Sequence, residues 1–113
     1  MKVIAVPYNS AHKQAVRLGD TLRILAQAPN DGNAWAGNVT IRTTYAASAT
    51  DDVAMSQYTG AKVAGEDWDL YVDYDTSTAP LAANTRYLAI AEMTSGSKKV
   101  EEHTVFTVLS QGR

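Results

Sequence analysis

Apolar and polar residues alternate along several stretches of this chain. Residues 68–75 read W-D-L-Y-V-D-Y-D, and 21–28 and 39–45 follow the same rhythm. A period of two is typical of a half-buried β-strand, whereas a helix repeats every 3.6 residues. In the first stretch one face would hold the apolar residues Trp68, Leu70, Val72 and Tyr74.

Short clusters of turn-forming residues separate these runs. Asp31-Gly32 lies between the runs 21–28 and 39–45, and Ser95-Gly96-Ser97 joins the last two runs as a hairpin would. A helix over 11–18 would end at Gly19, and we favour a strand or irregular crossing there. We expect strands near residues 2–6, 15–18, 21–28, 39–45, 53–58, 68–74, 86–94 and 99–109. The pattern predicts an all-β, antiparallel sandwich or barrel.

The stretch 81–87, L-A-A-N-T-R-Y, narrows the fold class. It is similar to the tyrosine corner of immunoglobulin-like and fibronectin-like sandwiches. Leu81 would fill the core, Asn84 would adopt a left-handed conformation, and the Tyr87 hydroxyl would bond to upstream backbone. Ala83 stands where proline is usual in this corner. The alternative is an ordinary strand that begins with tyrosine.

The resulting expectation is an antiparallel immunoglobulin-like sandwich of about seven to eight strands. It would span residues 15–109. Residues 1–14 would form an N-terminal arm or a first strand, and residues 110–113 a C-terminal tail.

Length, composition and charge narrow the possible partners. The chain has 113 residues and 12.2 kDa, with 45% hydrophobic and 19% charged residues, which fits one globular domain. A formal charge of −2 and scattered basic residues make nucleic acid an unexpected partner.

With no cysteine, disulfides and thiolate metal sites are excluded. The run of four apolar residues at positions 3–6, before Pro7, is too short for a signal peptide, and no apolar run is long enough to cross a membrane, so we expect synthesis in the cytosol.

The acidic and histidine residues do not predict a catalytic or metal site. Asp69, Asp73 and Asp75 would lie in a line along one strand face, whereas calcium needs about six to eight converging oxygens. His12 and His103 are the only histidines, too few for a zinc site. There is no G-x-S-x-G turn to present a nucleophile. We therefore expect no cofactor, no metal and no enzymatic activity.

The aromatic residues are the stronger candidates for function. Trp68, Tyr74 and Tyr87 are interpreted as core. Tyr8, Trp35, Tyr58 and Tyr71 are the candidate partner interface, since aromatic residues with polar tips are enriched at binding surfaces. For Trp35 we favour folding back over the end of the sandwich. The segment around Tyr8 could become ordered against a neighbour by adding a strand to an exposed edge.

Two further stretches carry a resemblance to a known family. Residues 18–24 read L-G-D-T-L-R-I, and residues 30–41 read N-D-G-N-A-W-A-G-N-V-T-I. Their order and spacing resemble a small module of tailed-bacteriophage virion proteins, found for instance at the N-terminus of upper baseplate proteins of lactococcal phages. Leu18 stands where that module has arginine. The resemblance extends over residues 15–109.

The resemblance implies a non-catalytic virion structural protein, either a capsid decoration or a neck, tail or baseplate adaptor. Its partners would be other virion proteins, with homo-oligomers on the particle. It would be made in the host cytoplasm and located in the virion. The alternative is a carbohydrate-binding sandwich in which Trp35, Tyr58 or Tyr71 stack on a sugar, and a small hydrolase ranks third.

Overall fold

A computed structural model describes residues 2–8, 14–43, 50, 52–77 and 81–110. Every regular element in these ranges is a strand. The strands are β1 (Lys2–Pro7), β2 (Ala15–Arg17), β3 (Thr21–Gln27), β4 (Ala36–Thr43), β5 (Val53–Ala54), β6 (Ser56–Gln57), β7 (Leu70–Asp75), β8 (Thr85–Ser95) and β9 (Lys98–Leu109). The all-β prediction is confirmed.

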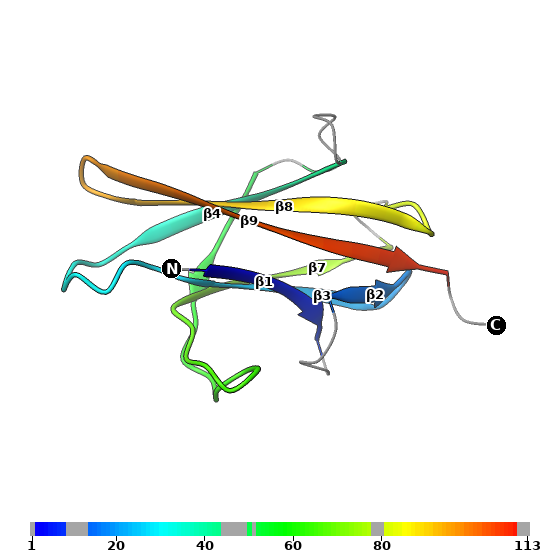
Figure 1. The fold of residues 1–113 in the computed structure, drawn as a ribbon, viewed down its shortest axis with the longest axis horizontal. Coiled ribbons are helices and arrows are strands. Elements are labelled where there is room, and N and C mark those ends of the chain that lie inside the picture. Colours follow the sequence, from blue (N-terminus) through cyan, green and yellow to red (C-terminus); the bar gives the residue numbers. More distant parts are fainter. Residues whose placement is uncertain (1, 9–13, 44–49, 51, 78–80, 111–113) are drawn as a thin grey trace.

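The strands form two sheets. Sheet A has the order β1-β3-β7-β6, and sheet B has the order β2-β9-β8-β4-β5. Figure 1 shows β4, β8 and β9 in one layer and β1, β3 and β7 in the other. Sheet B is curled like half a barrel. The N-terminal residues Lys2–Pro7 are the first strand of sheet A rather than a separate arm.

Two sequence expectations about the strands are wrong. The pair β2–β9 is parallel, and β2 belongs to a different sheet from β1 and β3, so no hairpin joins it to a neighbour in the sequence. The single strand expected at 53–58 is two short strands. Val53–Ala54 pairs with β4 of sheet B, whereas Ser56–Gln57 pairs with β7 of sheet A, so the chain changes sheet at Met55.

The main core is the apolar layer between the two sheets. Alternate residues of each long strand point into it, as the period-two pattern predicted. It includes Leu22 and Ile24 from β3, Ile41 from β4, Met93 from β8 and Phe106 from β9, all with exposed fractions of 1% or less.

A second apolar cluster covers the outer face of sheet A. Val6, Leu25 and Trp68 are its buried members, and the Trp68 indole N–H donates to the Val63 carbonyl at 2.9 Å. Leu25 lies between two residues that point into the main core, so its side chain points outward. The expectation that Trp68 shares a face with Leu70 is wrong, because β7 begins only at Leu70 and the preceding chain turns over the sheet.

Hydrogen bonds connect the two sheets, one of them through the interior. The buried Tyr74 hydroxyl on β7 donates to the Val39 carbonyl on β4 at 3.0 Å, and burial raises the pKa of Tyr74 to about 12. The Gln14 side-chain carbonyl accepts from Ala5 N–H on β1 at 2.9 Å and from the Thr104 hydroxyl on β9 at 2.8 Å. Buried polar groups are stable only when they are bonded in this way.

The predicted tyrosine corner is present. Leu81 and Tyr87 are buried, and Asn84 has a φ of 57°, in the left-handed region. The Ala82 N–H donates to the Tyr87 hydroxyl at 2.7 Å. The Tyr87 ring stacks on Phe106 with centroids 5.7 Å apart. All three expected roles in the corner are confirmed.

Replacing Tyr87 with phenylalanine should lower the free energy of unfolding by about 1 kcal/mol, because the Ala82 N–H loses its acceptor while the ring stays buried. Urea unfolding measures this change. Tyr8→Phe is the matched control, since the Tyr8 side chain is 58% exposed, and it should change stability by less than about 0.5 kcal/mol. Equal stability of Tyr87→Phe and wild type would show that the corner bond contributes nothing.

Candidate functional site

Three of the four candidate interface residues gather around one arginine. The Arg23 guanidinium lies 4.5 Å from the ring centroid of Tyr8, 4.9 Å from that of Tyr71 and 6.0 Å from that of Tyr58. These distances are those of cation–π contacts. We call Tyr8, Arg23, Tyr58, Tyr71 and Asp73 the tyrosine–arginine cluster.

Strand register explains why the cluster forms. On β3 and β7, Arg23 lies opposite Asp73. Both side chains point to the outer face of sheet A, since Ile24 and Val72 beside them point into the core. Two hydrogen bonds of 2.8 Å join the guanidinium to both oxygens of Asp73 and raise the pKa of Arg23. This bidentate contact with the carboxylate fixes the guanidinium beside the rings.

The tyrosines of the cluster are held in different ways. Tyr58 and Tyr71 meet edge to face, with centroids 5.7 Å apart, and the Tyr58 hydroxyl donates to the Ala61 carbonyl at 2.7 Å. Both are half-buried. Tyr8 is anchored by its N–H to the Thr21 carbonyl at 3.0 Å, yet its side chain is 58% exposed. Tyr8 therefore has the most exposed ring of the three.

Trp35 lies apart from the cluster, in the loop that precedes β4. Its side chain is 7% exposed, and the indole N–H donates to the Asp31 carboxylate at 3.1 Å. The favoured interpretation, in which Trp35 folds back, agrees with this burial. The prediction that Trp35 belongs to an exposed partner interface is wrong, because Asp31 and the core hold its ring.

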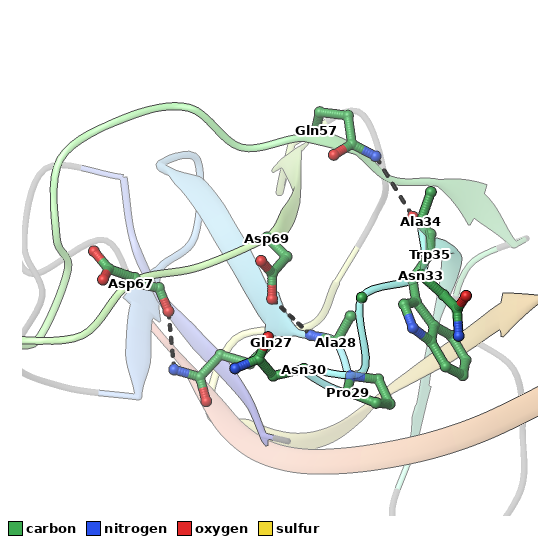
Figure 2. A pocket seen from close by; sticks show the side chains of 11 residues that line it. Gln27, Ala28, Pro29, Asn30, Asn33, Ala34, Trp35, Gln57, Asp67 and Asp69 are labelled. Atoms are coloured by element: carbon green, nitrogen blue, oxygen red, sulfur yellow. Dashed lines mark hydrogen bonds between the residues drawn. The ribbon is translucent and has the colours of Figure 1, made fainter.

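Trp35 does line a hollow of about 700 Å³ between the 27–35 segment and the chain before β7 (Figure 2). Gln27 donates from its side chain to the Asp67 carbonyl at 2.9 Å, and Asp69 accepts from Ala28 N–H at 2.9 Å. Amide and carboxylate side chains dominate the wall, which comprises Gln27, Ala28, Pro29, Asn30, Gly32, Asn33, Ala34, Trp35, Gln57, Asp67 and Asp69.

The chemistry of the hollow suits a neutral, hydroxyl-rich molecule. Amide side chains both donate and accept hydrogen bonds, and ionised carboxylates accept them. Asn30 and Asn33 are exposed at the wall. A polar ligand could bond to these groups without bringing a charge of its own.

The described histidine and acidic residues form no catalytic or metal-binding group. The His103 Nε2 lies 3.1 Å from a Glu101 oxygen, and both are exposed on β9. His12 lies outside the described residues. Across the described ranges no group of three or more His, Asp or Glu could hold a metal ion. No helix in the same ranges is long and apolar enough to cross a membrane.

Sequence reasoning missed Arg23, Asp73 and Asp31 as parts of these sites. Arg23 and Asp73 occupy outward positions on separate strands, so their pairing requires the register of β3 and β7. The Asp31 to Trp35 spacing of four residues was a local signal that could have been used, since an aspartate in a turn often accepts from nearby donors.

Comparisons with known proteins give no relative for this chain. No family model, no curated protein and no solved structure matches it.

Stability should depend on pH through Asp31. The Trp35 indole N–H, and next the Asn33 backbone N–H, lower the pKa of Asp31 from 3.8 to about 2. A carboxyl whose pKa is lowered in the folded state stabilises the fold above its unfolded pKa, and this contribution is lost as pH falls through the folded pKa. Asp31→Asn should therefore be less stable than wild type above pH 4, and the gap should close towards pH 2.

Urea unfolding of wild type and Asp31→Asn across this pH range measures the difference in their stability. Comparing the variant with wild type removes the contribution of Glu66, whose pKa is also lowered, by Lys2. A difference that stays constant across this range would contradict the role given to Asp31.

Proposed function

We propose that this protein is a non-catalytic structural module of a tailed-bacteriophage virion, an immunoglobulin-like sandwich that assembles through protein–protein contacts. It would serve as a capsid decoration or as a neck, tail or baseplate adaptor. The fold, the tyrosine–arginine cluster and the resemblance of residues 15–109 to virion modules support the proposal.

The strand order supports the immunoglobulin-like assignment. Sheet A, β1-β3-β7-β6, corresponds to strands A-B-E-D of an immunoglobulin domain, and β9-β8-β4 of sheet B correspond to G-F-C. The tyrosine corner lies at the start of β8, where such domains have it before strand F. Fold alone does not define function, so the binding role must come from the surface.

The observation that carries the proposed function is the stack of Tyr8 on Arg23. Tyrosine and arginine are enriched among the residues that dominate protein interfaces. Here Asp73 and Tyr71 hold the arginine in place before any partner arrives, and the exposed Tyr8 ring covers it. A preorganised anchor loses less side-chain entropy on binding, which favours a protein partner.

Tyr8→Ala should reduce the amount of this chain in assembled particles by about tenfold or more, because it removes an aromatic anchor. Tyr8→Phe keeps the ring over Arg23 and should assemble like wild type. Particles from a complementation assay, quantified by mass spectrometry, measure the incorporation. Thermal unfolding of the purified variants checks that each still folds.

Normal incorporation of folded Tyr8→Ala would contradict the assignment of this cluster as the binding surface.

A second candidate function rests on the polar hollow of Figure 2. Its amide and carboxylate wall and the nearby Trp35 favour a carbohydrate-binding module. The cluster tyrosines do not line this hollow, so the stacking platform expected from Tyr58 and Tyr71 would not form part of the site.

If the hollow binds sugars, neutral oligosaccharides should change the fluorescence of Trp35, and Asn30→Ala should weaken binding by about threefold to tenfold for one lost hydrogen bond. Asn38→Ala, an exposed asparagine on β4, is the control and should bind like wild type. No fluorescence change over a broad glycan panel would remove this candidate.

A further inference from the structure

The outer face of sheet B differs from that of sheet A. Trp68 and its neighbours cover part of sheet A, whereas β8 and β9 of sheet B present aliphatic side chains to solvent. Val105 is 39% exposed, and Leu88 and Ile90 are half-buried beside it, while Leu109, 41% exposed, lies further along β9 opposite Arg17. Leu88 lies directly opposite Val105 in the strand register. We call Leu88, Ile90 and Val105 the aliphatic band.

Charged residues of opposite sign border the band at its two ends. On β8 the outward positions read Arg86, Leu88, Ile90 and Glu92 in order. Arg42 on β4 and Arg17 on β2 lie towards the Arg86 end, because Arg42 is opposite Leu88 and Arg17 is opposite Leu109.

At the other end Glu101 lies directly opposite Glu92. Two like charges in directly opposed positions disfavour the pair. Lys99 lies 3.3 Å from Glu92, and His103 lies 3.1 Å from Glu101, so each carboxylate has one basic neighbour. The face therefore carries arginines at one end, aliphatic side chains in the middle and, at the other end, two carboxylates that each have a basic neighbour.

We propose that the outer face of sheet B binds a second copy of this chain, with β8 antiparallel to β8 of that copy. A two-fold axis that lies in the plane of the contact, perpendicular to β8 and midway between Leu88 and Ile90, reverses the order of the charges. Arg86 then faces Glu92 of the second copy, and Leu88 faces its Ile90. A two-fold contact uses the same patch on both copies, and this patch is complementary to itself.

The contact is small. Three strands about 4.8 Å apart and about seven residues of about 3.4 Å each give a face of roughly 350 Å² per copy. The total of roughly 700 Å² is below the 1,200 Å² or so of a standard stable interface, so the purified chain should form a weak dimer. On a particle, where copies are held close together, such a contact gains from effective concentration. The physiological setting of the inference rests on the proposed function.

A charge-reversal experiment tests both the face and its register. In Arg86→Glu the new carboxylate would meet Glu92 of an identical copy, and in Glu92→Arg the new guanidinium would meet Arg86. Each variant alone should dimerise at least about tenfold more weakly than wild type. In a mixture of the two variants, one copy is acidic at both positions and the other is basic at both. Opposite charges then meet at both ends of the contact, so the mixture should recover a dimer.

Sedimentation velocity over a range of protein concentrations measures dimerisation. Asp67→Arg is the matched control, because it reverses a charge on the opposite side of the molecule whose side chain is 86% exposed, and it should dimerise like wild type. Added salt should also weaken the wild-type dimer, since exposed ion pairs are screened.

A wild-type chain that stays monomeric at every concentration would overturn the inference. So would a mixture that dimerises no better than the single variants. Failure here is distinguishable from failure of the proposed function. If the chain is monomeric in solution but still enters particles, only the dimer proposal fails. If the chain dimerises but is absent from particles, only the virion proposal fails.

Discussion

The two sheets share one apolar layer, and the rest of the structure depends on burying it. Each long strand must present every second side chain inward, which fixes the faces of β3, β4, β7, β8 and β9. Tyr74 and Tyr87 bring hydroxyls into this layer, and both find backbone partners, on β4 and at Ala82. Burial of the rings is thus compatible with satisfied polar groups.

Once the inward residues are fixed, the outward residues determine what the molecule can bind. On sheet A the outward positions are divided between the Trp68 cluster, which stabilises the fold, and the tyrosine–arginine cluster, which presents Tyr8. On sheet B they form the aliphatic band with its basic and acidic ends. Of these surfaces, we propose the first for a partner protein and the second for a further copy of this chain.

Local patterns predicted much of the fold, because alternation and turn chemistry act over a few residues. Asn84 and Tyr87 were placed correctly for this reason. The errors have non-local causes. In the sequence Trp68 continues the alternating pattern of β7. In the structure the chain bends before Leu70, and the Trp68 ring covers the outer face of sheet A. The tyrosines of the candidate site were identified by residue type, whereas the Arg23 that joins them requires the pairing of two distant strands.

The central claim is that this chain is a repeated structural component of a virus particle. The most direct measurement is its copy number in purified particles from its source, by quantitative mass spectrometry against the major capsid protein. The account predicts a fixed number of copies that matches the symmetry of the capsid, neck, tail or baseplate. Absence of the chain from purified particles would contradict it.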